Sequence, residues 1–331
     1  MASLDIRPIV VVGAPRSGTT LLRYMLCGHP RIYIPPESHF IPHLFEHRPH
    51  GPMQPQQALR ALKRIWRYHV FFRDWQGERP ELASFVNNLP DLTPATLLDG
   101  LYSLYARQFG AERWGDKSPT YTTSMDLIAK IFPAAQFIHI IRDGRDVALS
   151  MIEAYGQRRF FYVNIYYAAG SWKHRVRKAL ASAARLDPCC YYQLHYEQLI
   201  VNPEAALRKI CDFLGETYYP TMAEPHKVAC NRSRSKGIHA KTTQPVTTSS
   251  MGRWRKEMSK EDLHIFQAVA GDLLNELGYG TIETGKMCLS ERARFYWLQS
   301  KYTLTEAVRR AAVAVGVPHP SGLVRRSWRV V

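Results

Sequence analysis

The chain has 331 residues, of which 46% are hydrophobic, so it is long and apolar enough to bury a full α/β core. Its 44 lysines and arginines against 28 acidic residues give a formal net charge of +16. No zinc-finger spacing, basic zipper or RNA-binding signature accompanies this charge, and no apolar run approaches the roughly 20 residues that span a bilayer. The composition therefore argues against a nucleic-acid partner and against an integral membrane protein.

The six cysteines show neither CxxC spacing nor the density of a disulfide framework, which predicts reduced thiols and a cytoplasmic location. The first apolar strand already begins at Ile9, and we expect no signal peptide before it.

Residues 9–20 predict a phosphate-binding turn. Ile9 to Val12 form a short apolar strand, and the segment Gly13-Ala-Pro-Arg-Ser-Gly-Thr-Thr20 follows it, directly before a helix expected over 18–27. Glycines allow close backbone approach, hydroxyls donate hydrogen bonds, and the helix N-terminus favours an anion.

The spacing of this turn resembles the nucleotide-binding pattern GxxxxGK[ST], but Thr19 stands where that pattern has lysine. The cation of the loop is instead Arg16. A magnesium-dependent nucleotide kinase uses the missing lysine, so this substitution argues against triphosphate chemistry and keeps the kinase as an alternative. A tight turn without a ligand is the other alternative.

Residues 31–60 are rich in histidine and proline and predict an irregular wall. Four histidines at spacings of four, four and three would form a metal-binding face on a helix: His39, His43, His47 and His50. Pro42 and Pro49 interrupt such a helix, and no metal is expected.

The middle of the chain predicts alternating helices and strands. Residues 56–110 are expected to be mainly helical, 114–119 extended, 137–141 a buried strand and 160–186 helical. Further on, 191–194 predict a strand, and 203–214 a helix that ends near Gly215. Residues 231–253 predict a flexible loop.

The last part of the chain predicts two more helices. An amphipathic helix is expected beyond 260, closing at Gly278. In the tail, Thr303 and Glu306 have the spacing of a capping box and predict the start of a helix that ends near Gly316. Residues 286–331 hold nine basic and two acidic residues, a net charge of +7.

Three segments together resemble the sulfotransferases that use 3′-phosphoadenosine 5′-phosphosulfate (PAPS). They are the loop Gly13 to Thr20, the segment from Arg142 to Ser150 after the mid-chain strand, and the segment His195-Tyr-Glu-Gln-Leu199. The resemblance extends from residue 8 to about 280. The chain is similar to the bacterial and tyrosylprotein members of that family.

The resemblance implies how the donor PAPS, and the product 3′-phosphoadenosine 5′-phosphate (PAP), are bound. Arg142 and Ser150 would grip the 3′-phosphate, Tyr196 would lie by the adenine, and Arg253 loosely resembles a residue of the segment that covers the cofactor. The 5′-phosphosulfate would lie on the first loop, through Pro15, Arg16, Ser17, Gly18, Thr19 and Thr20.

The resemblance also implies a set of catalytic residues. Glu37 matches the family's catalytic base, and His39 stands where tyrosylprotein sulfotransferases have an arginine. Lys117 matches the lysine that contacts the leaving oxygen, and Arg16 would neutralise charge beside it. Ala154 replaces a further arginine of the protein-tyrosine branch, which leaves membership of that branch open.

We therefore expect an α/β protein with the three-layer fold of P-loop NTPases, a central parallel sheet and a helical C-terminal extension. Residues 1–285 would form the PAPS-binding domain and 286–331 the basic extension. The expected reaction is transfer of a sulfuryl group to an acceptor hydroxyl, carried by a phenol or peptidyl tyrosine, a glycan, or a lipid or natural product. A non-catalytic module that binds anions or membranes through the basic tail is a further alternative. Peripheral membrane contact through that tail is also compatible with the enzyme.

Overall fold

The computed structural model describes residues 7–67, 78–155, 163–232, 244–283 and 285–314. The chain divides into two compact units that interleave in sequence. The first unit comprises Met1–Gly13, Gly18–Ile140 and Ala179–Val246, and the second comprises Ala14–Ser17, Ile141–Lys178 and Thr247–Val331. Among the described helices, none has the length and apolar character needed to cross a membrane.

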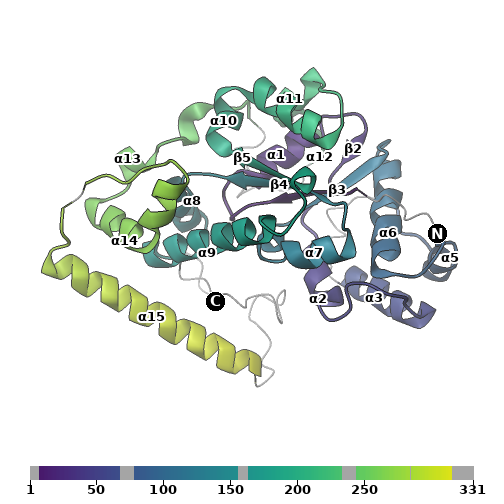
Figure 1. Ribbon diagram of the computed structural model, residues 1–331, viewed down its shortest axis with the longest axis horizontal. Helices are drawn as coiled ribbons and strands as arrows, with labels where there is room; N and C mark the ends of the chain where they lie inside the picture. The colour runs from purple at the N-terminus through teal and green to yellow at the C-terminus, as the bar shows by residue number, and fades with distance from the viewer. Residues whose placement is uncertain (1–6, 68–77, 156–162, 233–243, 284, 315–331) are drawn as a thin grey trace. The chain divides into compact units, whose positions relative to one another are not determined.

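A five-stranded sheet runs through the first unit in the order β2-β3-β1-β4-β5 (Figure 1). The strands are β1 (Ile9–Val12), β2 (Ile32–Tyr33), β3 (Arg113–Lys117), β4 (Gln136–Ile141) and β5 (Tyr191–His195). β1 pairs in parallel with both β3 and β4, so that Val10 lies opposite Asp116 on one side and Phe137 on the other. All four residues of β1 are buried, as expected for a central parallel strand with both faces covered.

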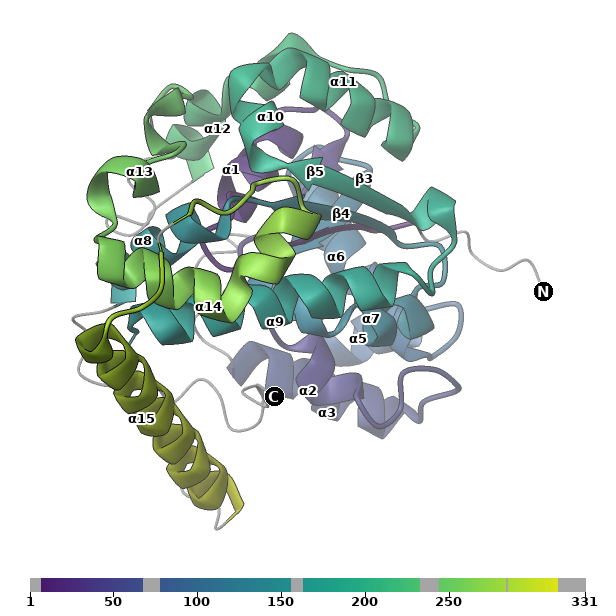
Figure 2. The ribbon, with the colours of Figure 1, turned by 60° about the vertical axis from the view of Figure 1, so that its left-hand side comes forward.

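Helices cover both faces of this sheet (Figures 1 and 2). One face carries α1 (Thr19–Leu26), α10 (Tyr196–Val201), α11 (Pro203–Leu214) and α12 (Pro225–Arg232). The main core lies at the other face, where Val10 and Val12 pack with apolar side chains of the following helices. These helices are α2 (Ile41–Phe45), α3 (Pro55–Arg67), α5 (Leu82–Asn87), α6 (Pro94–Gln108) and α7 (Met125–Ile131).

The second unit is helical. It contains α8 (Gly144–Tyr155), most of α9 (Ile165–Ala183), α13 (Trp254–Glu257), α14 (Lys260–Glu276) and α15 (Leu289–Ala314). Trp172 is fully buried, and a side chain at Gly144 would overlap its ring, since a Cβ there would lie 2.5 Å from Trp172. Short 3₁₀ helices complete the two units: η1 (Pro119–Thr123), η2 (Pro188–Cys190), η3 (Pro220–Ala223) and η5 (Thr248–Ser250).

These elements confirm the predicted α/β class with a central parallel sheet, including the strand at Ile9 and the helix that ends before Gly215. Two local predictions are wrong. Residues 31–60 are not an irregular wall, because they contain β2, α2 and the start of α3.

Thr303 does not begin a helix either, because α15 runs through it without a break. Its hydroxyl donates to the carbonyl oxygen of Gln299 at 3.0 Å, a contact within the helix rather than a cap. The predicted end of that helix near Gly316 lies outside the described residues, as do residues 233–243 of the predicted loop.

Candidate active site

The loop after β1 has an unusual backbone. Arg16 has φ 71° and Gly18 has φ 98°, both in the left-handed region that most residues avoid. The Ser17 N–H donates to the carbonyl oxygen of Ala14 at 3.1 Å and closes the turn. Of the described non-glycine residues, Arg16 and His39 alone have positive φ, and both are predicted site residues. Backbone strain of this kind typically accumulates at functional sites.

Glycine is required at position 18 for a second reason. A Cβ there would lie 2.5 Å from Cδ2 of Tyr196, at the first residue of α10. The Tyr196 ring is buried and packs directly on the loop. The structure thus brings Tyr196 to the predicted phosphate-binding turn, and a contact with adenine stays a prediction.

The start of α1 fits an anion. No acidic residue lies in its first turn, and no side chain caps its N-terminus. Ser17 is buried with 1% exposure, and its hydroxyl has no hydrogen-bond partner in the described part of the chain. A buried polar atom without a partner costs free energy, and phosphate oxygens would relieve that cost here.

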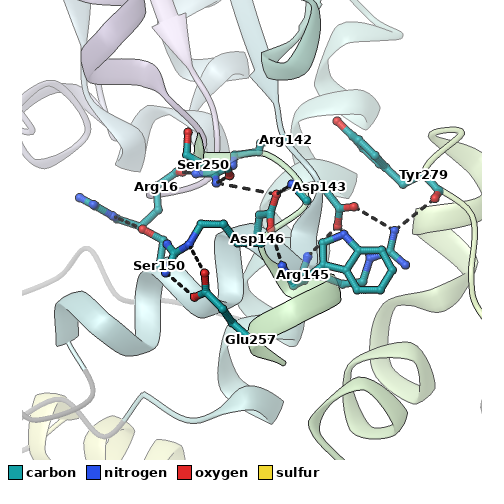
Figure 3. Close-up of polar contacts among 12 residues, drawn as sticks. Arg16, Arg142, Asp143, Arg145, Asp146, Ser150, Ser250, Glu257 and Tyr279 are labelled. Atoms are coloured by element: carbon teal, nitrogen blue, oxygen red, sulfur yellow. Dashed lines mark hydrogen bonds and ion pairs between the residues drawn. The ribbon is translucent and has the colours of Figure 1, made fainter. Parts of the chain in front are cut away.

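Arg16 joins the loop to the two residues predicted to bind the 3′-phosphate (Figure 3). Its Nε donates to Oγ of Ser150 at 3.1 Å, and Nη1 of Arg142 donates to its carbonyl oxygen at 3.1 Å. These partners lie 134 and 126 positions away in the sequence. Within the second unit, the three predicted donor-binding residues therefore form one cluster.

Asp146 and a later segment hold Arg142 in place. Arg142 is 5% exposed, donates to the carbonyl oxygen of Ser250 and lies 3.8 Å from the Asp146 carboxylate. Burial raises the pKa of Asp146, while hydrogen bonds from the N–H groups of Trp254 (3.0 Å) and Gly252 (2.7 Å) oppose that rise. The segment 250–254 thereby fixes the direction of the arginine.

Arg253 is engaged by two carboxylates. Its Nη1 donates to Glu153 at 3.2 Å and its Nε donates to Glu257 at 2.9 Å. These hydrogen bonds raise the pKa of Arg253. Because its guanidinium is already paired, its predicted contact with the donor has no support from this geometry.

A second cluster, in the first unit, contains the predicted catalytic residues. The carboxylate of Glu37 accepts hydrogen bonds from Nζ of Lys117 and, at 2.8 Å, from Nε2 of His39. Nδ1 of His39 lies 2.7 Å from Oγ1 of Thr120. Lys117 also donates to Oγ1 of Thr20, at 3.2 Å, and so connects Glu37 with the first turn of α1.

The pKa values of Glu37 and Lys117 in this cluster are shifted from their usual values. Burial by itself would raise the pKa of Glu37, but the ammonium of Lys117 and the hydrogen bond from His39 outweigh it, and the pKa lies far below its usual range. Burial lowers the pKa of Lys117, and the Glu37 carboxylate opposes that change. Each of the two charges therefore depends on the other.

A buried carboxylate, Asp116, holds the loop that carries Glu37. It accepts hydrogen bonds from Ser38 (2.5 Å), from Ser118 (2.8 Å) and from the hydroxyl of Tyr102. The Ser118 hydroxyl in turn accepts from the backbone N–H groups of Ser38 and His39, at 3.0 and 3.3 Å. These bonds maintain the strained backbone of His39, with φ 55°.

Sequence analysis missed Asp116, Ser38, Thr120 and Ser250. Asp116 and Ser38 stand next to predicted site residues in the chain, but they are 78 positions apart, and no local pattern reveals their contact. The four histidines do not share one helix face, since α2 contains only His43 of the four and Nε2 of His39 lies 2.8 Å from the Glu37 carboxylate. In the described part of the chain, no group of three or more metal-ligating side chains could hold an ion.

Comparison with known proteins identifies the family. The model of the sulfotransferase family matches residues 8–220, more than half of the chain. The chain therefore belongs to the sulfotransferase family.

Individual proteins similar to this chain also point to the sulfotransferase family. Over 282 residues the chain is 27% identical to protein-tyrosine sulfotransferase 1 of Danio rerio, with 83% of this chain and 73% of that protein covered. It is 26% identical over 328 residues to nodulation protein NoeE of Sinorhizobium fredii, with 88% and 74% covered. The sulfotransferase domain from the curacin biosynthetic pathway has the same fold, with a TM-score of 0.57 at 20% identity, covering 83% of this chain and 99% of that domain.

Proposed function

We propose that this protein transfers a sulfuryl group from PAPS to an acceptor hydroxyl. The observation that carries the proposal is the Arg16 cluster, in which one loop residue contacts both Arg142 and Ser150. An ordinary strand-to-helix turn needs no such long-range partners. A donor with phosphate at both its 3′ and 5′ positions does need two anion sites joined in this way.

In this proposal the loop from Gly13 to Thr20 holds the 5′-phosphosulfate, and Arg142 with Ser150 holds the 3′-phosphate. The free Ser17 hydroxyl and the uncapped start of α1 offer donors to the first group. The planar guanidinium of Arg142 suits phosphate oxygens better than a lysine would.

Glu37 is proposed as the general base. PAPS supplies the group that moves: the acceptor oxygen bonds to sulfur, the bond from sulfur to the 5′-phosphate oxygen breaks, and the acceptor proton leaves. Glu37 is ionised at neutral pH, as an ordinary glutamate is, and its lowered pKa keeps it so; it can therefore accept that proton without first losing one. His39 orients the carboxylate through its hydrogen bond.

Lys117 is proposed to couple the base to the donor. It contacts both Glu37, the proposed base, and Thr20, a residue of the proposed donor-binding segment. When an anion on the loop draws the ammonium away from Glu37, the carboxylate loses the cation that lowers its pKa and becomes a stronger base. Arg16 and Lys117 then stabilise the negative charge that develops on the leaving phosphate.

We propose the acceptor from the names of the relatives and from the reactivity of hydroxyl groups. The relative in Danio rerio is named a protein-tyrosine sulfotransferase, so a tyrosine-containing peptide is the first acceptor to test. Glycan, phenol, lipid and natural-product hydroxyls follow, because Glu37 and Lys117 act on any hydroxyl that reaches them.

Nucleotide selectivity tests the donor. We expect PAP to raise the melting temperature of the full chain, because a ligand that binds the folded state stabilises it by mass action. ATP with magnesium should raise it much less. A larger shift with ATP and magnesium, or no preference for the 3′-phosphate, would reject the proposal in favour of a kinase.

Replacement of Glu37 tests the base. With labelled PAPS and an acceptor that wild type sulfates, E37Q should lose at least a hundredfold in turnover and keep its affinity for PAP. Glu46, an exposed carboxylate nine residues later, provides the matched control E46Q, which should stay near wild type. Full activity of E37Q would remove Glu37 from this role.

A further inference from the structure

The outer face of α15 exposes an unusual number of large apolar side chains. Seven such side chains are strongly exposed in the described residues, and four of them belong to this helix. They are Leu289 (82% exposed), Tyr296 (57%), Trp297 (55%) and Leu304 (67%). Single exposed apolar residues are common, but a group of this size on one helix indicates a binding surface.

Helical spacing places these residues together. With 100° between successive residues, positions 289, 296 and 304 fall on one side of the helix, and 297 lies at its border. Exposed small residues fill the same side at positions 293, 300 and 307. The result is a continuous apolar stripe, which we call the α15 stripe.

The opposite side of α15 is already packed within the second unit. Leu298 is buried, the ring of Phe295 lies 5.4 Å from that of Tyr166, and Glu291 pairs with His264 at 2.8 Å. Arg294 adds an ion pair with Asp262 at 2.7 Å. These contacts fix the rotation of the helix, so the α15 stripe faces away from the helices that hold it (α15 is the long yellow helix of Figure 2).

Among the side chains that the structure describes, the charged ones at the borders of the α15 stripe are all basic. Arg292 lies along one border and Lys301 along the other, with the Lys301 ammonium 4.8 Å from the centre of the Trp297 ring. The acidic Glu291 belongs to the packed side. Residues 286–331 as a whole carry a net charge of +7. An apolar stripe with cations on both borders is the pattern of a helix that lies in a membrane interface.

We propose that α15 docks this protein onto an anionic phospholipid membrane, with its axis parallel to the surface. The α15 stripe would enter the boundary of the acyl chains, and Arg292 and Lys301 would reach the phosphate groups. A second copy of the chain fits less well. A symmetric contact would place the same patch on both partners and would bring the cations of two stripes together with no described carboxylate between them.

Vesicle flotation of the full chain tests the proposal. Wild type should bind vesicles of phosphatidylcholine with about one third phosphatidylserine and bind pure phosphatidylcholine vesicles at least tenfold more weakly. The double variant R292Q/K301Q should lower the partition coefficient on anionic vesicles roughly thirtyfold, since each cation near such a surface contributes about a factor of five. The variant W297S/L304S should lower it at least tenfold.

Matched controls use residues of other helices. K63Q/K209Q removes two exposed lysines of α3 and α11, and V201S removes an apolar side chain that is 65% exposed on α10. Both controls should stay within twofold of wild type. All variants should keep the wild-type circular dichroism spectrum, because Lys301 is half-buried and the other altered side chains are exposed.

Three results would overturn the proposal. Equal binding to neutral and anionic vesicles would remove the charge argument. Unchanged binding of both α15 variants would assign any membrane affinity to another part of the chain. A wild-type dimer in sedimentation velocity that W297S/L304S converts to monomer, with no vesicle binding, would make a second copy the occupant. None of these readouts depends on sulfuryl transfer, so they stand apart from the test of the proposed function.

Discussion

Replacing Arg142 with glutamine distinguishes the contribution of the proposed 3′-phosphate site to binding from that of the 5′-phosphate site. Arg142 is buried, and its guanidinium lies at the carbonyl oxygens of Arg16 and Ser250. A hydrogen bond to a charged group contributes about 1.5–3 kcal/mol, so losing a two-pronged contact with the 3′-phosphate should cost about 3 kcal/mol. At about 1.4 kcal/mol per factor of ten, PAP affinity should fall about a hundredfold.

The assay is isothermal titration calorimetry with PAP and with adenosine 5′-monophosphate, which lacks the 3′-phosphate. R142Q should weaken PAP strongly and adenosine 5′-monophosphate less than threefold. R142K should lie between wild type and R142Q, because lysine keeps the charge but not the fork.

The variant should still fold, because Asp146 keeps its hydrogen bonds from Gly252 and Trp254 after Arg142 is removed. Arg253 is the matched control: its guanidinium is bound by Glu153 and Glu257, so R253Q should change PAP affinity less than threefold. Equal weakening of both nucleotides by R142Q would mean that Arg142 only supports the loop through Arg16. No weakening of either would refute our assignment.

Three further predictions concern the first unit. D116N should lower the free energy of unfolding by about 1–3 kcal/mol, measured in urea, because the buried carboxylate accepts three hydrogen bonds; a change under 0.5 kcal/mol would contradict this. K117M should raise the pKa of Glu37, since burial then acts without the opposing ammonium. In wild type the ionised Glu37 carboxylate stabilises the fold above the pKa that glutamate has in the unfolded chain, about 4.3. This stabilisation is lost as the pH falls through the lowered pKa of the folded state. K117M should therefore move the loss of stability to higher pH in acid-unfolding curves. G18A should abolish PAP binding, because its Cβ would overlap the Tyr196 ring at a positive φ; retained binding in calorimetry would show that the loop can rearrange.

Local signals were strong enough to predict the frame of the fold. The apolar run at Ile9 to Val12 has no polar alternation, which marks a strand buried on both faces, and the glycines after it mark the turn. The helix before Gly215 was equally clear, since glycine adopts the left-handed conformation there, with φ 71°.

Long-range contacts were beyond the sequence. The Asp116 network depends on side chains that meet only after the sheet has formed, and the carboxylates that bind Arg253 lie on two different helices. The prediction of a helix start at Thr303 is wrong because no glycine or proline lies between Leu289 and Thr303, so the helix continues through Thr303. A cap motif is informative only where the preceding residues cannot be helical.

A crystal structure of the protein with PAP tests the central claim most directly. Our account predicts the 5′-phosphate on the N–H groups of the loop from Gly13 to Thr20, and the 3′-phosphate within hydrogen-bond distance of both Arg142 and Ser150. A 3′-phosphate exposed to solvent, or a nucleotide bound elsewhere while this loop keeps the Arg16–Ser150 contact, would contradict it.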